Sequence, residues 1–239
     1  FSHDIRAAGV DYLSRPVDKG LPTARCLIFV TPDAQRTMQT YLGVSVQLGP
    51  TDIDPEVVGA AQITYLEGYL FDKEPAKKAF IKAAELAHAA GHKVALSLSD
   101  PFCVDRHRSA FRHLISGHVD VLFANEVEII SLVEANSFDD AVNAIRDHCE
   151  IAALTRGAHG SVIVTAEKVV EIAAEPVERV VDTTGAGDLF AAGVTYGLTQ
   201  GFEHGTCGRL GSIAAGEVIG HYGARPQSPL SDLVYRQIR

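Results

Sequence analysis

The chain has 239 residues, of which 46% are hydrophobic, and its formal net charge at pH 7 is −9. A chain of this length can bury a sizeable core, either as one large domain or as two small ones. Because the balance is acidic and the basic residues are scattered, we expect neither a nucleic-acid-binding protein nor a protein of the membrane surface.

The first fifty residues predict the end of a helix and then a β-hairpin. Residues 1–10, FSHDIRAAGV, resemble the last turns of a helix capped by Gly9, so we expect the chain to begin inside its domain. Residues 24–48 are rich in Val, Ile, Thr, Tyr and Phe and are interrupted by a Pro-Asp turn. That composition favours a hairpin, which we interpret as a lid over a binding site.

From residue 54 onward, strand patterns alternate with helix patterns. Strands are predicted over 62–69, 92–100, 119–125 and 151–155, with two or three short ones within 161–181. Helices are predicted from 54, over 74–91, over 106–115, from 126, and over 137–148, 185–199 and 204–222. This alternation predicts an α/β fold with a mostly parallel sheet covered on both faces.

Ligands of an open parallel sheet bind beyond the carboxyl ends of its strands. The segments that follow the predicted strands are polar or rich in glycine: 67–69, Asp100, 125–128, 155–157 and 182–188. We therefore expect these segments to converge on one edge of the sheet.

The segment 182–188, DTTGAGD, precedes a predicted apolar helix and matches neither the Walker A motif nor G-x-G-x-x-G. The unpaired N–H groups of a helix N-terminus attract anions, and small residues at 185–187 leave that backbone bare. With Thr184 as the cap, Asp188 would lie one turn inside the helix and could accept a proton from an alcohol that attacks a phosphoryl group. The simpler alternative makes Asp188 the N-cap and the glycines a turn.

Two further segments also have two interpretations each. Asn125 and Glu128 stand where a predicted strand passes into a helix, so the pair either forms a capping box or organises Mg²⁺ and its waters. The segment 155–160, TRGAHG, follows a buried strand, so it is either a simple glycine turn or part of the binding site.

These motifs together resemble the ribokinase-like, or PfkB-type, family of carbohydrate and nucleoside kinases. DTTGAGDLF is similar to the family's D-T-x-G-A-G-D-x-F signature, NEVE to its N-x-x-E motif and TRGAHG to its T-x-G-x-x-G turn, in the family's order. The resemblance implies a three-layer α/β/α, doubly wound, mostly parallel sheet with a small β lid at about 24–48. It also implies one kinase domain over 1–239 whose N-terminal part is missing.

The resemblance implies roles for individual residues. Asp188 would be the catalytic base, and the backbone of Gly185, Ala186 and Gly187 would form the anion hole. The other implied residues are Asn125 and Glu128 for Mg²⁺, largely through water, Thr155, Gly157 and Gly160 for ATP, and Asp182 and Thr184 for a monovalent cation such as K⁺ in members that have that site.

Within the family, the stretches LPTARC, QRTMQTYL and YLEGYLF are similar to adenosine kinases. The substrate-binding residues that this similarity implies are Cys26, Arg36, Met38, Leu42 and Tyr69. A pocket of apolar and aromatic side chains suits a purine better than a bare sugar.

The function that follows is an ATP- and Mg²⁺-dependent kinase that phosphorylates a primary hydroxyl of a nucleoside, adenosine first, giving AMP. A sugar kinase of the same fold and a non-catalytic nucleotide-binding protein are the alternatives. The partners expected are small molecules, and both a monomer and a homodimer stay open because a hairpin edge can cover a site or pair with a second copy. The four cysteines lie far apart, which is typical of reduced thiols in a cytoplasmic protein.

Overall fold

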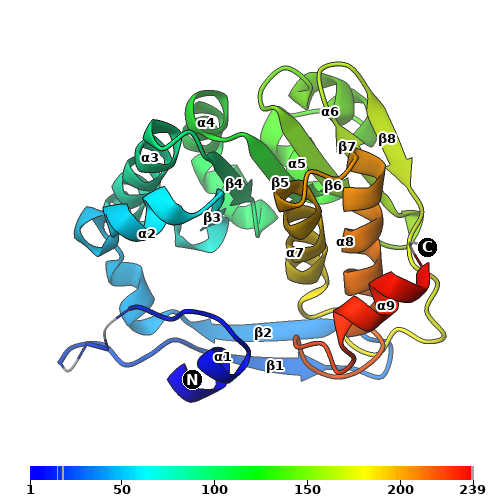
Figure 1. Ribbon diagram of the computed structural model, residues 1–239, viewed down its shortest axis with the longest axis horizontal. Helices are drawn as coiled ribbons and strands as arrows, with labels where there is room; N and C mark the ends of the chain where they lie inside the picture. The colour runs from blue at the N-terminus through cyan, green and yellow to red at the C-terminus, as the bar shows by residue number, and fades with distance from the viewer. Residues whose placement is uncertain (15, 18, 238–239) are drawn as a thin grey trace.

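A sheet of six strands forms the centre of the computed structural model, which describes residues 1–14, 16–17 and 19–237 (Figure 1). In spatial order its strands are β3 (Ile63–Glu67), β4 (Lys93–Ser97), β5 (Val121–Asn125), β6 (Ile151–Thr155), β7 (Ser161–Val164) and β8 (Val169–Ile172). The first four run parallel, and β7 and β8 continue the sheet as an antiparallel ribbon. Spatial order follows chain order throughout the part of the sheet that the structure describes.

Helices cover both faces of this sheet, and Figure 1 shows the second group in front of it. The first group is α3 (Glu74–Ala89), α4 (Pro101–His118), α5 (Glu126–Val133) and α6 (Phe138–Ile145), and the second is α7 (Ala186–Thr199) and α8 (His204–Val218). Because successive strand residues point to opposite faces, Leu96 and Leu122 join the core under the first group, and Ala95 and Phe123 join the core under the second. The predicted three-layer α/β/α fold is confirmed.

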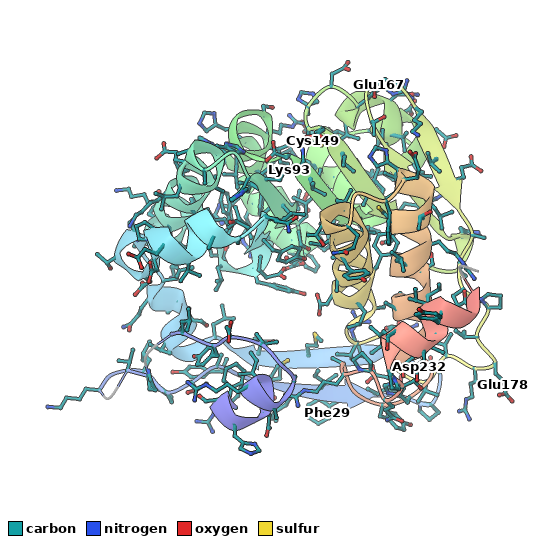
Figure 2. All side chains as sticks on the ribbon, viewed as in Figure 1. Phe29, Lys93, Cys149, Glu167, Glu178 and Asp232 are labelled. Atoms are coloured by element: carbon teal, nitrogen blue, oxygen red, sulfur yellow. The ribbon has the colours of Figure 1, made fainter. Side chains whose placement is uncertain are left out.

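The predicted hairpin forms a separate two-stranded sheet, the lid, from β1 (Arg25–Val30) and β2 (Arg36–Tyr41). Figure 1 shows this ribbon crossing the molecule below the central sheet. In Figure 2, Lys93 at the start of β4 and Cys149 just before β6 lie at the opposite end of the sheet from Phe29 of the lid. The lid therefore lies at the carboxyl ends of the strands, where ligands of such sheets bind.

The remaining elements are short. They are α1 (Ser2–Ala7), α2 (Pro55–Ala60), α9 (Leu230–Gln237) and the 3₁₀ turns η1 (Gly43–Gln47), η2 (Pro50–Asp52), η3 (Gly68–Leu70) and η4 (Gly157–His159). None of the helices among the described residues is both long and apolar enough to cross a bilayer.

Several element boundaries differ from those predicted. The helix predicted over 106–115 begins at Pro101, because the Asp100 side chain accepts a hydrogen bond of 3.0 Å from the Phe102 N–H and proline fits the first helical position. The helix predicted over 204–222 ends at Val218, and the region 161–181 holds two strands.

Candidate active site

The carboxyl ends of β3 to β6 lie side by side, as predicted. The strand register pairs Glu67 with Ser97 and Asn125 with Thr155. Burial and, to a lesser extent, the charge of Asp188 raise the pKa of Glu67, so the start of α7 reaches the same edge. The predicted convergence of these segments is therefore observed.

The segment 182–188, called the anion turn from here on, is organised around Asp182. This side chain is 3% exposed, and its Oδ1 accepts hydrogen bonds from the N–H and the hydroxyl of Thr184 at 2.9 and 2.6 Å. Its Oδ2 accepts a bond of 3.0 Å from the N–H of Gly223, in the loop after α8. Burial opposes ionisation of Asp182, but these bonds outweigh burial and lower its pKa. The role of Asp182 and Thr184 beside a monovalent cation stays a prediction.

Thr184 does not cap α7, so that part of the prediction is wrong. The N-cap is Gly185, whose backbone is left-handed (φ 83°, ψ −2°), and no side chain caps the helix. The hydroxyl of Thr184 donates to Asp182 instead. Asp188 is the third helical residue, so the alternative that made it the N-cap is also wrong.

At the start of α7 the Ala186 N–H donates to the Thr183 carbonyl at 3.3 Å, while the backbone of Gly185 and Gly187 lies near the exposed carboxylate of Asp188. The first N–H groups of a helix have no partner within it, and they carry the positive end of the helix dipole. A Cβ at Gly187 would meet no atom within 4 Å, so solvent or a ligand can approach this backbone. Asp188 is exposed one residue further on. Amides at this helix start can stabilise charge on a phosphoryl group while the carboxylate accepts a proton from the alcohol that attacks it.

Asn125 and Glu128 form the capping box that begins α5. The Asn125 side chain accepts from the Glu128 N–H at 2.9 Å, and Glu128 accepts from the Asn125 N–H at 2.9 Å and from its amide at 2.7 Å. Glu128 is 5% exposed, and burial raises its pKa to about 6. The capping interpretation is confirmed, while the role of this pair toward Mg²⁺ stays a prediction.

The segment 155–160 forms the tight turn between β6 and β7. Gly157 and Gly160 both have positive φ, of 55° and 84°, and the Arg156 N–H donates to the Gly160 carbonyl at 2.8 Å. A Cβ at Gly160 would lie 2.1 Å from the Ile172 carbonyl oxygen, whereas one at Gly157 would meet nothing. The turn thus explains both glycines, and contacts of Thr155, Gly157 and Gly160 with ATP stay predictions.

One face of the lid is directed toward the anion turn. Arg36 donates a hydrogen bond to the hydroxyl of Thr183. Cross-strand pairing places Met38 on the same face as Arg36, together with Cys26, whose Sγ lies 3.2 Å from the hydroxyl of Thr40. Arg36, Met38 and Cys26 therefore share the lid face that looks toward the site.

Leu42 and Tyr69, both predicted to bind substrate, line one cavity of about 320 Å³. The cavity lies between the segment after the lid and α4, and its other lining residues are Val46, Leu70, Asp72, Lys73, Arg106 and His107. Met38 and Cys26 do not line it. The predicted substrate residues thus divide between the inner face of the lid and this lateral cavity.

Three polar or aromatic residues at the same edge were not among the predicted site residues, although Glu67 belongs to a segment that was expected to reach it. Glu67 ends β3, and burial raises its pKa to about 7 even though Ser99 donates a hydrogen bond to it. Ser99 itself has a left-handed backbone (φ 67°). Phe102, at the start of α4, is 71% exposed. Their place in the sequence could have identified them, because each residue stands near the end of a predicted strand or just beyond it.

The edge carries an excess of negative charge. Glu67, Glu128 and Asp188 are close enough for the charges of the latter two to contribute to the raised pKa of Glu67. Among the described residues, none of the three takes part in an ion pair with Lys, Arg or His. A set of carboxylate oxygens without a cationic side chain fits Mg²⁺, which prefers hard oxygen ligands and retains water.

Comparison with known sequences assigns this arrangement to a family. The sequence pattern described as "pfkB family carbohydrate kinase" matches residues 1–230. The chain belongs to the pfkB family. The predicted kinship with ribokinase-like kinases, which are phosphotransferases with an alcohol group as acceptor, is confirmed.

Two solved structures are similar to this chain over almost all of its length. An adenosine kinase from Sinorhizobium meliloti is 47% identical with a TM-score of 0.96, and the match covers 100% of this chain and 73% of that one. A probable sugar kinase from Rhizobium etli CFN 42 is 47% identical with a TM-score of 0.95, covering 98% and 72%. A match at 38% identity to an uncharacterized sugar kinase of Archaeoglobus fulgidus covers 46% of this chain and 44% of that protein.

A more distant structural neighbour was solved with nucleotide and metal bound. A putative ribokinase II from E. coli, solved in complex with ATP and Mg²⁺, is 18% identical with a TM-score of 0.78, over 90% of this chain and 71% of that one. At this identity the likeness concerns the fold. The comparisons thus include both nucleoside and sugar kinases and leave the acceptor of this pfkB chain open.

Proposed function

We propose that this pfkB family chain carries the phosphoryl-transfer site of an ATP-dependent kinase whose acceptor is a nucleoside, most of all adenosine, with AMP as the product. Asp188 accepts the proton of the primary hydroxyl while the hydroxyl oxygen attacks the γ-phosphorus of ATP and ADP leaves. The single observation that carries the proposal is the start of α7, where an exposed carboxylate stands beside the open backbone of Gly187.

The first turn of α7 supplies the electrostatic part of this reaction. The backbone amides at Gly185, Ala186 and Gly187 stand at the positive end of the helix dipole and stabilise negative charge on the transferring phosphoryl group. Mg²⁺, when bound near Glu128 and Asn125, neutralises phosphate charge. Burial raises the pKa of Glu128. A cation bound nearby would lower this pKa again and favour the ionised form.

The lid supports a nucleoside as the acceptor. Its inner face carries Met38 and Arg36, and Leu42 and Tyr69 line the neighbouring cavity. Apolar and aromatic side chains of this kind suit the flat face of a base. The similarity to the adenosine kinase of Sinorhizobium meliloti agrees with this choice.

A sugar is the second candidate acceptor, favoured by one specific observation. Glu67 lies at the carboxyl end of β3 and accepts a hydrogen bond from Ser99. Among the described residues it has no cationic partner. A carboxylate in this position can hold sugar hydroxyls, and the probable sugar kinase of Rhizobium etli is as similar as the adenosine kinase.

Replacement of Asp188 tests the chemistry. We expect Asp188→Asn in the full-length protein to lower kcat by about a hundredfold or more, because a general base contributes on that scale, with little change in ATP affinity. Steady-state kinetics with Mg-ATP measure the first, and calorimetric titration with ATP the second. Asp139→Asn is the matched control, because Asp139 is likewise an exposed aspartate in the first turn of a helix. Wild-type turnover in Asp188→Asn would refute the assignment.

A screen of acceptors separates the two candidates. The full-length protein with Mg-ATP is offered adenosine, other nucleosides, ribose and fructose, and the phosphorylated product is identified by mass. Adenosine phosphorylation supports the nucleoside proposal, whereas phosphorylation of sugars alone replaces it with the sugar kinase. Turnover that persists after divalent metal is chelated contradicts the scheme in both forms.

A further inference from the structure

Outside the anion turn, Asp72, Cys103 and His107 bring three different ligand types together. Cys103 and His107 stand one helical turn apart on α4, and Asp72 follows η3. One potential ligand atom from each residue lies within 4.8 Å of the other two. In the part of the chain that the structure describes, no other group of three or more such side chains meets this condition.

The backbone and the surrounding rings hold His107 in this arrangement. Helical geometry breaks at His107 (φ −124°, ψ 21°), inside α4. Its Nε2 lies 2.8 Å from Asp72 Oδ1, and its ring meets the buried ring of Phe71 edge-on at a centroid distance of 6.2 Å. A kinked helix and a packed aromatic neighbour thus orient the imidazole toward Asp72.

We propose that Asp72, Cys103 and His107 form a binding site for one borderline-soft divalent metal ion, Zn²⁺ first. Thiolate, imidazole and carboxylate are the three side-chain ligands that Zn²⁺ takes, and it binds in tetrahedral sites. A thiolate ligand disfavours Mg²⁺, so this site is separate from the magnesium chemistry of the kinase.

Two of the three proposed ligands border a cavity. Asp72 and His107 both line the cavity of about 320 Å³ that also contains Leu42 and Tyr69. Three protein ligands beside an accessible volume leave room for water or a small anion as the fourth ligand. The site is thus of the open kind rather than a closed structural one.

Two interactions oppose metal binding: the contact of Arg106 with Asp72, and the proton on the thiol of Cys103. The Arg106 guanidinium donates hydrogen bonds to Asp72 at 3.2 to 3.3 Å, but the Arg106 side chain is 53% exposed and can turn into solvent. Cys103 is 1% exposed, and burial raises the pKa of its thiol to about 11. Metal binding therefore releases the thiol proton to solvent, and the new metal–sulfur bond compensates for it.

Cobalt provides the direct test, because Co²⁺ takes zinc sites and a bound thiolate gives it an intense near-ultraviolet charge-transfer band. The full-length protein is freed of metal with a chelator, titrated with Co²⁺ and then with Zn²⁺. We expect the charge-transfer band, saturation at one Co²⁺ per chain, and displacement by Zn²⁺. Absence of the thiolate band at saturating Co²⁺ would overturn the site.

Variants assign the ligands. We expect Cys103→Ser to abolish the band, and His107→Asn and Asp72→Asn to weaken Co²⁺ binding by at least about tenfold, since loss of even an outer partner of a ligand costs that much. The two latter changes are on partly exposed side chains, so they keep the test decisive if the buried Cys103→Ser variant fails to fold.

Matched controls exist elsewhere in the chain. Cys149→Ser removes a different thiol, and His88→Asn breaks another histidine–carboxylate contact, of 2.9 Å to Asp120. Both controls should leave the Co²⁺ titration unchanged. A band that survives in His107→Asn and Asp72→Asn with unchanged affinity, or that disappears in Cys149→Ser, would refute the ligand set proposed here.

Discussion

Gly185 and Gly187 flank Ala186 in the anion turn, and they are constrained by different contacts. Gly185 has φ 83°, and a Cβ there would lie 2.9 Å from the Cβ of Ala224. A Cβ at Gly187 would meet nothing within 4 Å. Packing within the chain therefore accounts for the first glycine, while the second is free of any structural demand and is available to serve a ligand.

This difference predicts opposite effects of two alanine substitutions. Gly185→Ala should lower the free energy of unfolding by at least about 1 to 2 kcal/mol, the cost of a left-handed backbone for a residue with a Cβ. Gly187→Ala should raise it by up to about 1 kcal/mol, because alanine is the better helix former. Yet Gly187→Ala should also lower kcat by about tenfold to a hundredfold, since small misplacements of reacting groups cost that much.

Urea denaturation and steady-state kinetics on the same preparations check both effects. If Gly187→Ala kept full turnover, the open backbone at this position would have no part in binding the phosphoryl group. A Gly185→Ala variant as stable as the wild type would contradict the close approach of Ala224.

The buried carboxyl group of Glu67 should make the free energy of unfolding depend on pH. The ordinary pKa of 4.5 is raised to about 7, first by burial and then by the charges of Asp188 and Glu128, against the hydrogen bond from Ser99. Between these two values the folded chain holds a proton that the unfolded chain has lost. The free energy of unfolding should therefore decrease as the pH rises from 4.5 to 7 and should not recover above that range.

Removing this charge should flatten that dependence. We expect Glu67→Gln to unfold at a higher urea concentration than the wild type at about pH 8 and at a similar one at about pH 5. The upper bound for the difference is about 3 kcal/mol, at 1.36 kcal/mol per unit of pKa. Glu171→Gln, on the exposed side of β8, is the control. Parallel pH profiles of Glu67→Gln and the wild type would show that Glu67 titrates normally.

At the scale of residues, the sequence predicted which positions lie at the site better than it predicted the partners of their side chains. Asn125 and Glu128 were predicted both as a capping box and as a functional pair, and the box is observed because its partners are close in sequence. Thr184 was predicted to cap α7, but its hydroxyl donates to Asp182 instead. Both partners are close in sequence to Thr184, and the pattern did not distinguish between them. Ala224, which constrains Gly185, approaches from a loop that no local pattern connects to the anion turn.

At the scale of elements, the lid depends on contacts at its ends. An isolated two-stranded ribbon is marginally stable at best. Every residue of β2 is exposed, so the lid has no core of its own. The hydrogen bond from Arg36 to Thr183 is therefore an anchor that holds β2 over the anion turn.

Loss of this anchor should loosen the whole ribbon. A hydrogen bond of a charged group contributes about 1.5 to 3 kcal/mol, so Arg36→Ala should speed amide hydrogen exchange in β1 and β2 by a factor on the order of ten to a hundred. Exchange followed by mass spectrometry measures it. Thr37→Ala, on the outer face of the same strand, should leave exchange unchanged. Equal exchange in Arg36→Ala and the wild type would mean that other contacts hold the lid.

The order of elements could be predicted because strand and helix patterns are local and alternate regularly. The kink at His107 could not, because no local pattern marks it and the contacts of its side chain, with Asp72 and Phe71, come from another segment. Pro101 is a different case, because Asp100 and Pro101 form a local helix-start signal that the prediction of a helix over 106–115 overlooked.

At the scale of the whole molecule, one sheet serves two cores. Leu132 of α5 belongs to the cluster on one face and Val194 of α7 to the cluster on the other, and the two clusters share strands β4, β5, β6 and β7. Neither group of helices can leave without exposing apolar residues of the same strands. We therefore expect the chain to unfold as one unit.

Substitutions on either face should shift a single transition. Leu132→Ala should lower the free energy of unfolding by about 2 to 5 kcal/mol, and Val194→Ala, which removes fewer carbon atoms, by less. Circular dichroism and tyrosine fluorescence should give the same midpoint in urea for each variant. Separate midpoints for the two probes, or a variant that moves one part of a two-step curve, would divide the chain into independent units.

The bond between Arg36 and Thr183 joins residues 147 positions apart, and this sets an order of events during synthesis. Translation proceeds at about 5 to 20 residues per second, so roughly 7 to 30 seconds separate the two residues on the ribosome. Strands β3 to β8 emerge in the order in which they pair, so the sheet can grow by one neighbour at a time. The lid, although made before these strands, gains this anchor only after all six of them have been made.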